Sequence, residues 1–285
     1  MLSDTLEQQL ESIEGLPTLP LVLRQIQAVM NNERTSMAQI ASVVAKDQAL
    51  TSRAIRLVNS AWYGRTTKVT SIQQVLVTIG LKTLNTLMLG LTATKLFSTS
   101  ESKLFSAQAF WEHAFGTALI AKKIALTTGL KGESEDFFVG GLLHDMGRLV
   151  LEQFFHDQFT AALELTHNKR ISLIESEKEI FGFDHTDAGA FLGSKWNIPR
   201  RLVMAMKYHH TTSISSDILP EEREMVRIVS AANELCLSYK IGASGEEIYE
   251  NKFSMSLKGI SHETIYQLVE EARKEVVATL LQWSH

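Results

Sequence analysis

An adjacent histidine and aspartate, His144-Asp145, stand in the apolar segment 140–149. Residues of these two types in such a setting are candidates for binding a metal ion. A carboxylate among apolar residues needs a partner, because losing its hydration is costly. A divalent metal ion is one such partner, and imidazole with carboxylate suits Fe, Mn, Zn or Ni better than Ca or Mg. The alternative is an ion pair between Asp145 and Arg148, one helical turn along, with His144 hydrogen-bonded in the core. The dipeptide alone favours this alternative.

Further histidines stand in or at the ends of expected helices, and each alone is more often a satisfied core or surface histidine than a ligand. His113 stands among aromatic and aliphatic residues, and His185 begins an expected helix. The pair His209-His210 ends another expected helix. Cysteine occurs once, which excludes a disulfide framework and Cys-rich zinc modules, so any metal would be held by imidazole and carboxylate. No chemistry is assigned to the remaining histidines, which are His156, His167, His262 and His285.

The elements that must position these residues are predicted to be helices. No proline occurs between residues 21 and 198, and helix interiors exclude proline. Apolar residues recur at helical spacing, and Asp47, Ser71 and Ser172 stand where helix caps belong. We expect a buried helix over 81–97, a long helix over 107–128 and a last helix over 261–283. No segment alternates with period two between hairpin turns, so the predicted fold is all-α.

Composition and charge narrow the function classes. The chain has 285 residues, with 45% hydrophobic residues, 21% charged residues and a net charge of -4, which is typical of a globular protein without a general affinity for nucleic acid. A local basic cluster, Arg53, Arg56, Arg65 and Lys68, lies near Trp62 and Tyr63. Nucleic-acid binding is one interpretation of this cluster, but the acidic balance favours a solvated face. No signal peptide or membrane span is recognised, so a cytoplasmic location is expected.

The order of these residues resembles that of a known family. His113, His144-Asp145, His185 and His209-His210 follow one another as in the HD superfamily of metal-dependent phosphohydrolases. More specifically, residues 15–240 resemble the HDOD domain proteins. The motifs that carry this resemblance are LPTLP (16–20), DQALTSR (47–53), RLVNSAWYG (56–64), SIQQVLVTIG (71–80), FWEH (110–113) and WNIP (196–199).

This resemblance implies an architecture and a role. The expected fold is a multi-helical, HD-like arrangement of two helical subdomains packed together. We expect an N-terminal subdomain over 1–100, an HD-like subdomain over 101–240, and a C-terminal loop and helix over 241–285. HDOD domains are viewed as bacterial signalling or regulatory modules without established catalysis. The resemblance therefore implies a protein partner in a signalling pathway, or a nucleotide-like ligand.

The related HD-GYP phosphodiesterases hold two metal ions, and the resemblance transfers their ligand set to this chain. One ion position would be built from Asp145, His185, His209 and His210, and it is complete. The other would use His113, His144, Asp145 and a final aspartate, but Asn233 stands in that last place.

The chain departs from the HD-GYP pattern elsewhere too. Arg148 replaces the expected lysine, and Ala109 replaces a carboxylate one turn before His113. The glycine-tyrosine-proline segment is replaced by Thr211-Thr212-Ser213.

Two function hypotheses follow. The first is a regulatory module that keeps a degenerate pocket, with one or two metal ions or none. The second is a metal-dependent phosphohydrolase acting on a nucleotide or a cyclic dinucleotide. In that enzyme Asp145 would bridge two ions, which activate water, and Arg148 would meet a phosphate oxygen. The amide at Asn233 favours the first hypothesis, because it removes a negative charge from the ligand set.

Overall fold

The computed structural model describes residues 4–30, 36–59, 68–97, 104–211, 218–242, 245 and 259–283. Within these ranges the regular elements are all helices, so the predicted all-α class is confirmed. The chain divides into two compact units. One unit comprises residues 17–96 and 277–285, and the other comprises residues 1–16 and 97–276. The two units are described in turn.

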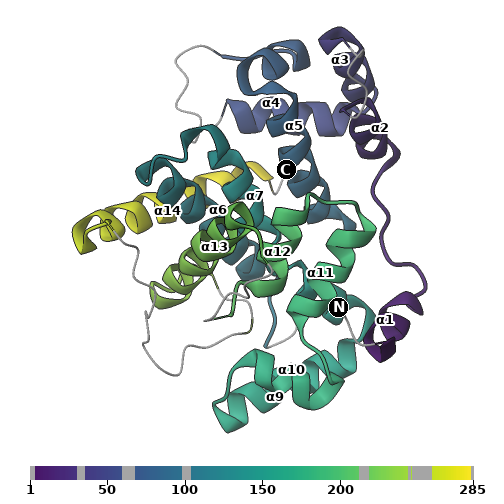
Figure 1. Ribbon diagram of the computed structural model, residues 1–285, viewed down its shortest axis with the longest axis vertical. Helices are drawn as coiled ribbons and strands as arrows, with labels where there is room; N and C mark the ends of the chain where they lie inside the picture. The colour runs from purple at the N-terminus through teal and green to yellow at the C-terminus, as the bar shows by residue number, and fades with distance from the viewer. Residues whose placement is uncertain are drawn as a thin grey trace. The chain divides into compact units, whose positions relative to one another are not determined.

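Among the described residues, four helices lie wholly within the smaller unit (Figure 1). They are α2 (Leu21–Met30), α3 (Met37–Ala45), α4 (Gln48–Val58) and α5 (Ile72–Leu96). The predicted caps are present: the Asp47 carboxylate accepts a hydrogen bond from Leu50 N at 2.9 Å, and Ser71 Oγ accepts one from Gln74 N at 3.2 Å. Gly80 interrupts α5 with a φ of 76°. This left-handed conformation is cheap only for glycine, so the predicted helix after residue 80 is a separate helical segment.

The segment between α4 and α5 is closed by one asparagine. Asn59 Nδ2 donates to the Val69 carbonyl at 2.6 Å, and Val69 N donates to Asn59 Oδ1 at 2.7 Å. One side chain therefore satisfies both backbone groups of a residue ten positions along the chain. Of the aromatic and basic residues between them, Trp62, Tyr63 and Arg65 lie outside the described residues, and Lys68 is exposed.

The larger unit carries the histidines. Its helices are α1 (Asp4–Glu11), α6 (Ala107–Thr127), the 3₁₀ helix η2 (Lys131–Glu133), α7 (Ser134–Leu143), α8 (Met146–Phe154), α9 (His156–Lys169), α10 (Leu173–Phe181), α11 (His185–Lys195), α12 (Arg200–Tyr208), α13 (Pro220–Ser238) and α14 (His262–Trp283), which belongs to this unit as far as Val276. Local signals set many of these boundaries. Ser172 and Glu175 form the predicted capping box of α10, and Pro220 occupies the first turn of α13.

Two glycines bring the helices of this unit into close contact. A Cβ on Gly141 would lie 2.7 Å from Ala118 Cα, so α7 can approach α6 only because this residue is glycine. A Cβ on Gly147 would overlap the carbonyl oxygen of His185, so α8 meets the start of α11 in the same way. These two approaches lie on either side of His144-Asp145 in the sequence. They therefore fix the turn between α7 and α8 against both neighbouring helices.

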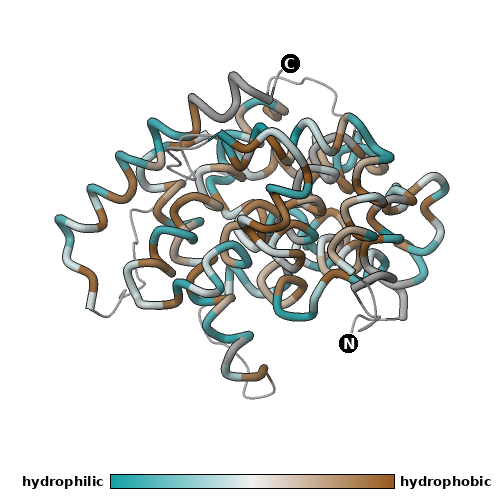
Figure 2. The backbone as a smooth tube through the Cα atoms, turned by 90° about the horizontal axis from the view of Figure 1, so that it is seen from above, coloured by the Kyte–Doolittle hydropathy of each residue, from teal (hydrophilic) through white to brown (hydrophobic). Residues whose placement is uncertain are grey.

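The last expected helix is present as α14 and is amphipathic. Ile265, Val269, Ala272 and Val276 are buried along one face of α14, while Lys123 of α6 pairs with Glu271 at 2.8 Å. Figure 2 shows the resulting alternation of hydrophobic and hydrophilic colour along the helix that leads to the C-terminus. Among the described helices, including this one, none combines the length and the apolar character that crossing a membrane requires.

Candidate metal centre

Four parts of the larger unit contribute side chains to one buried centre. His113 lies in the middle of α6, and His144-Asp145 forms the turn between α7 and α8. His185 is the first residue of α11, and His209-His210 directly follows α12. The structure therefore brings together all the histidines that the sequence placed in HD-like order. Two groups of three or more potential ligands result, and within each group the ligand atoms lie within 4.8 Å of one another.

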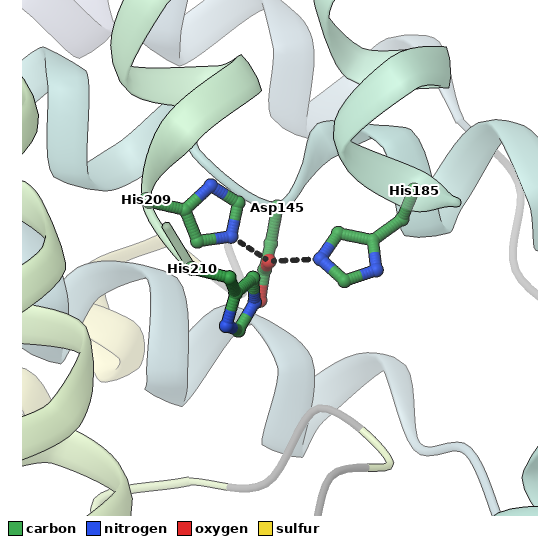
Figure 3. Close-up of side chains that lie close together, drawn as sticks. All are labelled: Asp145, His185, His209 and His210. Carbon is green, nitrogen blue, oxygen red and sulfur yellow. Dashed lines mark ion pairs between the residues drawn. The ribbon is translucent and has the colours of Figure 1, made fainter. Parts of the chain in front are cut away.

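The first group surrounds one oxygen of Asp145 (Figure 3). His209 Nε2 lies 3.2 Å from Asp145 Oδ1, and His185 Nε2 lies 3.5 Å from the same oxygen. His210 lies beside them and completes the group. We name this set, Asp145, His185, His209 and His210, the Oδ1 side.

The second group faces the other oxygen of the same carboxylate. His144 Nε2 lies 3.3 Å from Asp145 Oδ2, and His113 Nε2 lies 3.7 Å from it. We name this set, His113, His144 and Asp145, the Oδ2 side. Asn233 of α13 is also here, and its Oδ1 lies 2.8 Å from His113 Nε2. An amide oxygen only accepts hydrogen bonds, so this contact requires a proton on His113 Nε2.

Three of the imidazoles are anchored through Nδ1, which leaves Nε2 directed at the carboxylate. His144 Nδ1 contacts the Gly141 carbonyl at 2.6 Å, and His209 Nδ1 contacts the Met206 carbonyl at 3.0 Å. His185 Nδ1 contacts Glu177 at 2.6 Å. The Nε2 atoms of these three histidines are buried and have no hydrogen-bond partner among the described residues. Such a set of converging nitrogen atoms around a carboxylate fits a metal ion.

The electrostatics of the centre keep most ligands in the state that binds metal. Burial lowers the pKa of His209 to about 4 and also lowers the pKa of His210. Burial acts to raise the pKa of Asp145, but Arg148 and His144 outweigh it and hold that pKa well below its ordinary value. The result is neutral imidazoles with a lone pair next to an ionised carboxylate, which is the donor set a transition metal prefers.

His185 differs from its neighbours. Burial acts to lower its pKa, but the carboxylate of Glu177 outweighs burial and raises it. Glu177 was not among the residues predicted from the sequence. Its α10 position is eight residues before His185, a separation that corresponds to no local motif. Its burial beside the candidate ligand His185 depends on how α10 lies against the start of α11.

Arg148 supports part of the alternative interpretation of the His-Asp dipeptide. Its Nε lies 3.3 Å from Asp145 Oδ1, and its side chain is fully buried. The ion pair predicted as an alternative to metal binding is therefore present alongside the histidine cluster. A buried guanidinium retains its proton under all ordinary conditions, so it supplies the centre with a permanent positive charge.

The other histidines lie elsewhere. His156 and His167 belong to α9, and His156 contacts Glu152 at 3.1 Å. His262 begins α14, and His285 lies outside the described residues.

The described residues form an all-helical fold with a buried histidine–aspartate cluster that could hold a metal ion. The sequence model of the HDOD domain matches residues 16–212. The chain belongs to the HDOD domain family.

Similar proteins agree with this assignment. An HDOD domain protein of unknown function from Geobacter sulfurreducens is 24% identical, with a TM-score of 0.72 over 98% of this chain and 93% of that one. A protein from Shewanella amazonensis SB2B, provisionally named a phosphohydrolase, is 21% identical, with a TM-score of 0.71 over 96% of this chain and 98% of that one. One from Marinobacter aquaeolei VT8, provisionally named a signal transduction protein, is 20% identical, with a TM-score of 0.74 over 100% of this chain and 62% of that one. At these identities the likeness establishes the fold.

A sequence relative has also been found in Treponema pallidum (strain Nichols). This uncharacterized protein is 25% identical over 224 residues, which are 78% of this chain and 42% of the relative. The chain therefore spans less than half the length of that relative.

Proposed function

We propose that this protein is a regulatory HDOD module of bacterial signal transduction, located in the cytoplasm, whose Oδ1 side binds a single divalent transition-metal ion. The ligands would be Asp145, His185, His209 and His210. This donor set suits Fe, Mn, Zn or Ni. The bound ion would hold the ends of α11 and α12 at the turn before α8, and the module would act by presenting its surface to a protein partner or by binding a nucleotide-like ligand.

The observation that carries the proposal is the contact between His113 and Asn233. A histidine binds a metal through a ring nitrogen without a proton, at about 2.0–2.2 Å. His113 Nε2 is instead engaged by the Asn233 amide at 2.8 Å. If the amide were turned round, its NH₂ group would donate to Nε2 and occupy the lone pair, with the same consequence. The Oδ2 side then retains His144 and Asp145 as ligands, too few for a second ion of this kind.

Burial of the centre also supports a regulatory or structural role. The side chains of His113, His144, Asp145 and His185 are fully buried and His209 is 2% exposed, whereas His210 is partly buried. Structural metal sites are closed by protein ligands, whereas catalytic sites keep a position open for water or substrate.

A second function has its own support. A two-metal phosphohydrolase of nucleotides or cyclic dinucleotides would use the same ligands together with Arg148, and the Shewanella protein is provisionally named for such an activity. In that reaction, ions supply an activated water and stabilise the phosphate oxygens. The buried position of Arg148, with Nε directed at Asp145, favours the regulatory proposal, because this guanidinium balances the carboxylate.

Metal counting separates the two functions. Protein reconstituted with Mn(II) or Fe(II) is expected to retain one ion per chain by elemental analysis. His209→Ala is expected to lose that ion, while His113→Ala is expected to keep it. Cyclic dinucleotides and nucleotides should remain uncleaved by the loaded protein. Two ions per chain, together with hydrolysis that His144→Ala abolishes, would establish the enzyme instead.

A further inference from the structure

Glu177 makes a double contact with one of the candidate ligands. Its Oε2 atom accepts a hydrogen bond from His185 N at 2.9 Å and lies 2.6 Å from His185 Nδ1. The Glu177 side chain is fully buried on α10. A buried carboxylate is costly unless it is paired, and here it has two donors of the same residue. Glu177 is therefore held in place by His185, and it holds His185 in return.

The two hydrogen bonds have different consequences for His185. The backbone bond satisfies an N–H group in the first turn of α11, which has no partner within the helix. The ring bond requires a proton on Nδ1, because a carboxylate only accepts. With Nδ1 protonated and fixed, Nε2 is left to face Asp145 Oδ1 at 3.5 Å. A histidine in this state can direct its lone pair at an ion between the two residues.

The helix that carries Glu177 is anchored away from the centre. α10 packs against α9, and Ser176, the residue next to Glu177, accepts a hydrogen bond from Thr166 of α9 at 2.8 Å. Both of these hydroxyl side chains are buried. A movement of the α9–α10 pair would therefore displace Glu177 and release the His185 ring.

We propose that Glu177 is a positioning residue that orients His185 for the ion and links the docking of α10 to ion binding. This inference rests on the proposed function, in which His185 is a ligand. It assigns Glu177 a role without direct contact with the ion. Carboxylates that accept from the second nitrogen of a ligating histidine fix its tautomer and raise its basicity, and their loss costs about 10–100-fold in metal affinity.

Cobalt titration tests the link to the ion. Co(II) binding, followed by its visible absorption bands, should weaken by about 10–100-fold in Glu177→Ala. Glu177→Gln should lie between Glu177→Ala and the wild type, because the amide oxygen can still accept from Nδ1 but carries no charge. The matched control is Glu179→Gln on the same helix, where the exposed carboxylate pairs with Lys169 at 2.9 Å. Equal Co(II) affinity in the wild type and in a folded Glu177→Ala protein would overturn the proposal.

A second measurement does not depend on metal. The ¹⁵N shifts of the His185 ring in metal-free protein should show a protonated Nδ1 in the wild type and in Glu179→Gln. In Glu177→Ala they should move toward the Nε2-protonated form that free histidine prefers. An unprotonated His185 Nδ1 in the wild type would overturn the positioning role even if the variants failed to fold. If the wild type takes up no Co(II) while the ring shifts behave as expected, the proposed function fails and the orientation of His185 by Glu177 stands.

Discussion

The Oδ1 side and the Oδ2 side of Asp145 contain similar residues, but their histidine nitrogens make different contacts. On the Oδ1 side, His185 and His209 point Nε2 at the carboxylate, and Nδ1 of each ring is anchored by a neighbouring group. On the Oδ2 side, His144 is anchored in the same way through Gly141. His113 is not, because its Nε2 contacts Asn233 at 2.8 Å. The difference shows that proximity to a carboxylate does not make a histidine a ligand. The nitrogen must also be free of other partners.

The largest effect is expected from removing the Asp145 carboxylate, which both sides share. Asp145→Ala should abolish ion binding and, in metal-free protein, lower the free energy of unfolding by about 3–5 kcal/mol, because the buried Arg148 guanidinium loses the Asp145 carboxylate. Elemental analysis and urea denaturation measure the two effects. Glu164→Gln removes an exposed carboxylate from α9 and is the control. A variant as stable as the wild type would mean that another group balances the charge of Arg148. Asp145 would then not be the group that stabilises both sides.

The next effect concerns the Oδ2 side alone. Asn233→Asp should raise the ion content from one to two per chain, because the new carboxylate replaces the amide that engages His113. With Mn(II), electron paramagnetic resonance should change from the spectrum of an isolated ion to that of a spin-coupled pair. Asn168→Asp adds the same charge at an exposed position on α9 and should leave one ion. A single uncoupled ion in Asn233→Asp would show that more than the amide distinguishes the two sides.

The third effect is the pH dependence of stability in the metal-free protein. Burial lowers the pKa of His113 to about 3 and that of His209 to about 4 in the folded state, whereas an unfolded histidine titrates at about 6.5. Below about pH 6.5 the unfolded chain therefore binds more protons than the folded one, and stability falls as the pH falls. Each such group contributes a slope of up to about 1.4 kcal/mol per pH unit. His185, whose pKa is raised, opposes this trend.

Urea denaturation between pH 7 and 5 measures this slope, and one variant assigns part of it. His113→Gln should flatten the decline by the contribution of one group while the downward trend from His209 and His210 remains. A profile identical to that of the wild type would show that the pKa of His113 is the same in the folded and unfolded states, so that His113 becomes charged below about pH 6.5. The Oδ2 side would then differ from the Oδ1 side in charge as well as in hydrogen bonding.

Much of the fold could be predicted because its signals are local. Asp47, Ser71 and Ser172 were recognised as caps from the residues that follow them, and all three accept the expected backbone hydrogen bonds. The long helix expected over 107–128 corresponds to α6, and Gly129, which follows it, has a φ of 89°. Such boundaries depend on residues within one turn of each other, so a sequence displays them directly.

The predicted metal centre was only partly accessible from the sequence. The order of the histidines pointed to side chains that the structure brings together, and Asn233 departs from the ligand set that the resemblance implies. Glu177 was missed, because its relation to His185 depends on how α10 meets α11. The role of Gly147 was also missed, since a sequence does not reveal that the carbonyl oxygen of His185 occupies the space of its absent side chain.

The sequence by itself determined the helical elements, the family and the identity of the groups that can meet at a centre, because these depend on residue type and spacing. The tertiary structure alone decided which atoms of those groups face one another. It placed Oδ1 and Oδ2 of Asp145 in two different surroundings, and it set Asn233 against His113 from 120 residues away. Whether a nitrogen can bind a metal depends on its other contacts, and those contacts come from helices that are distant along the chain.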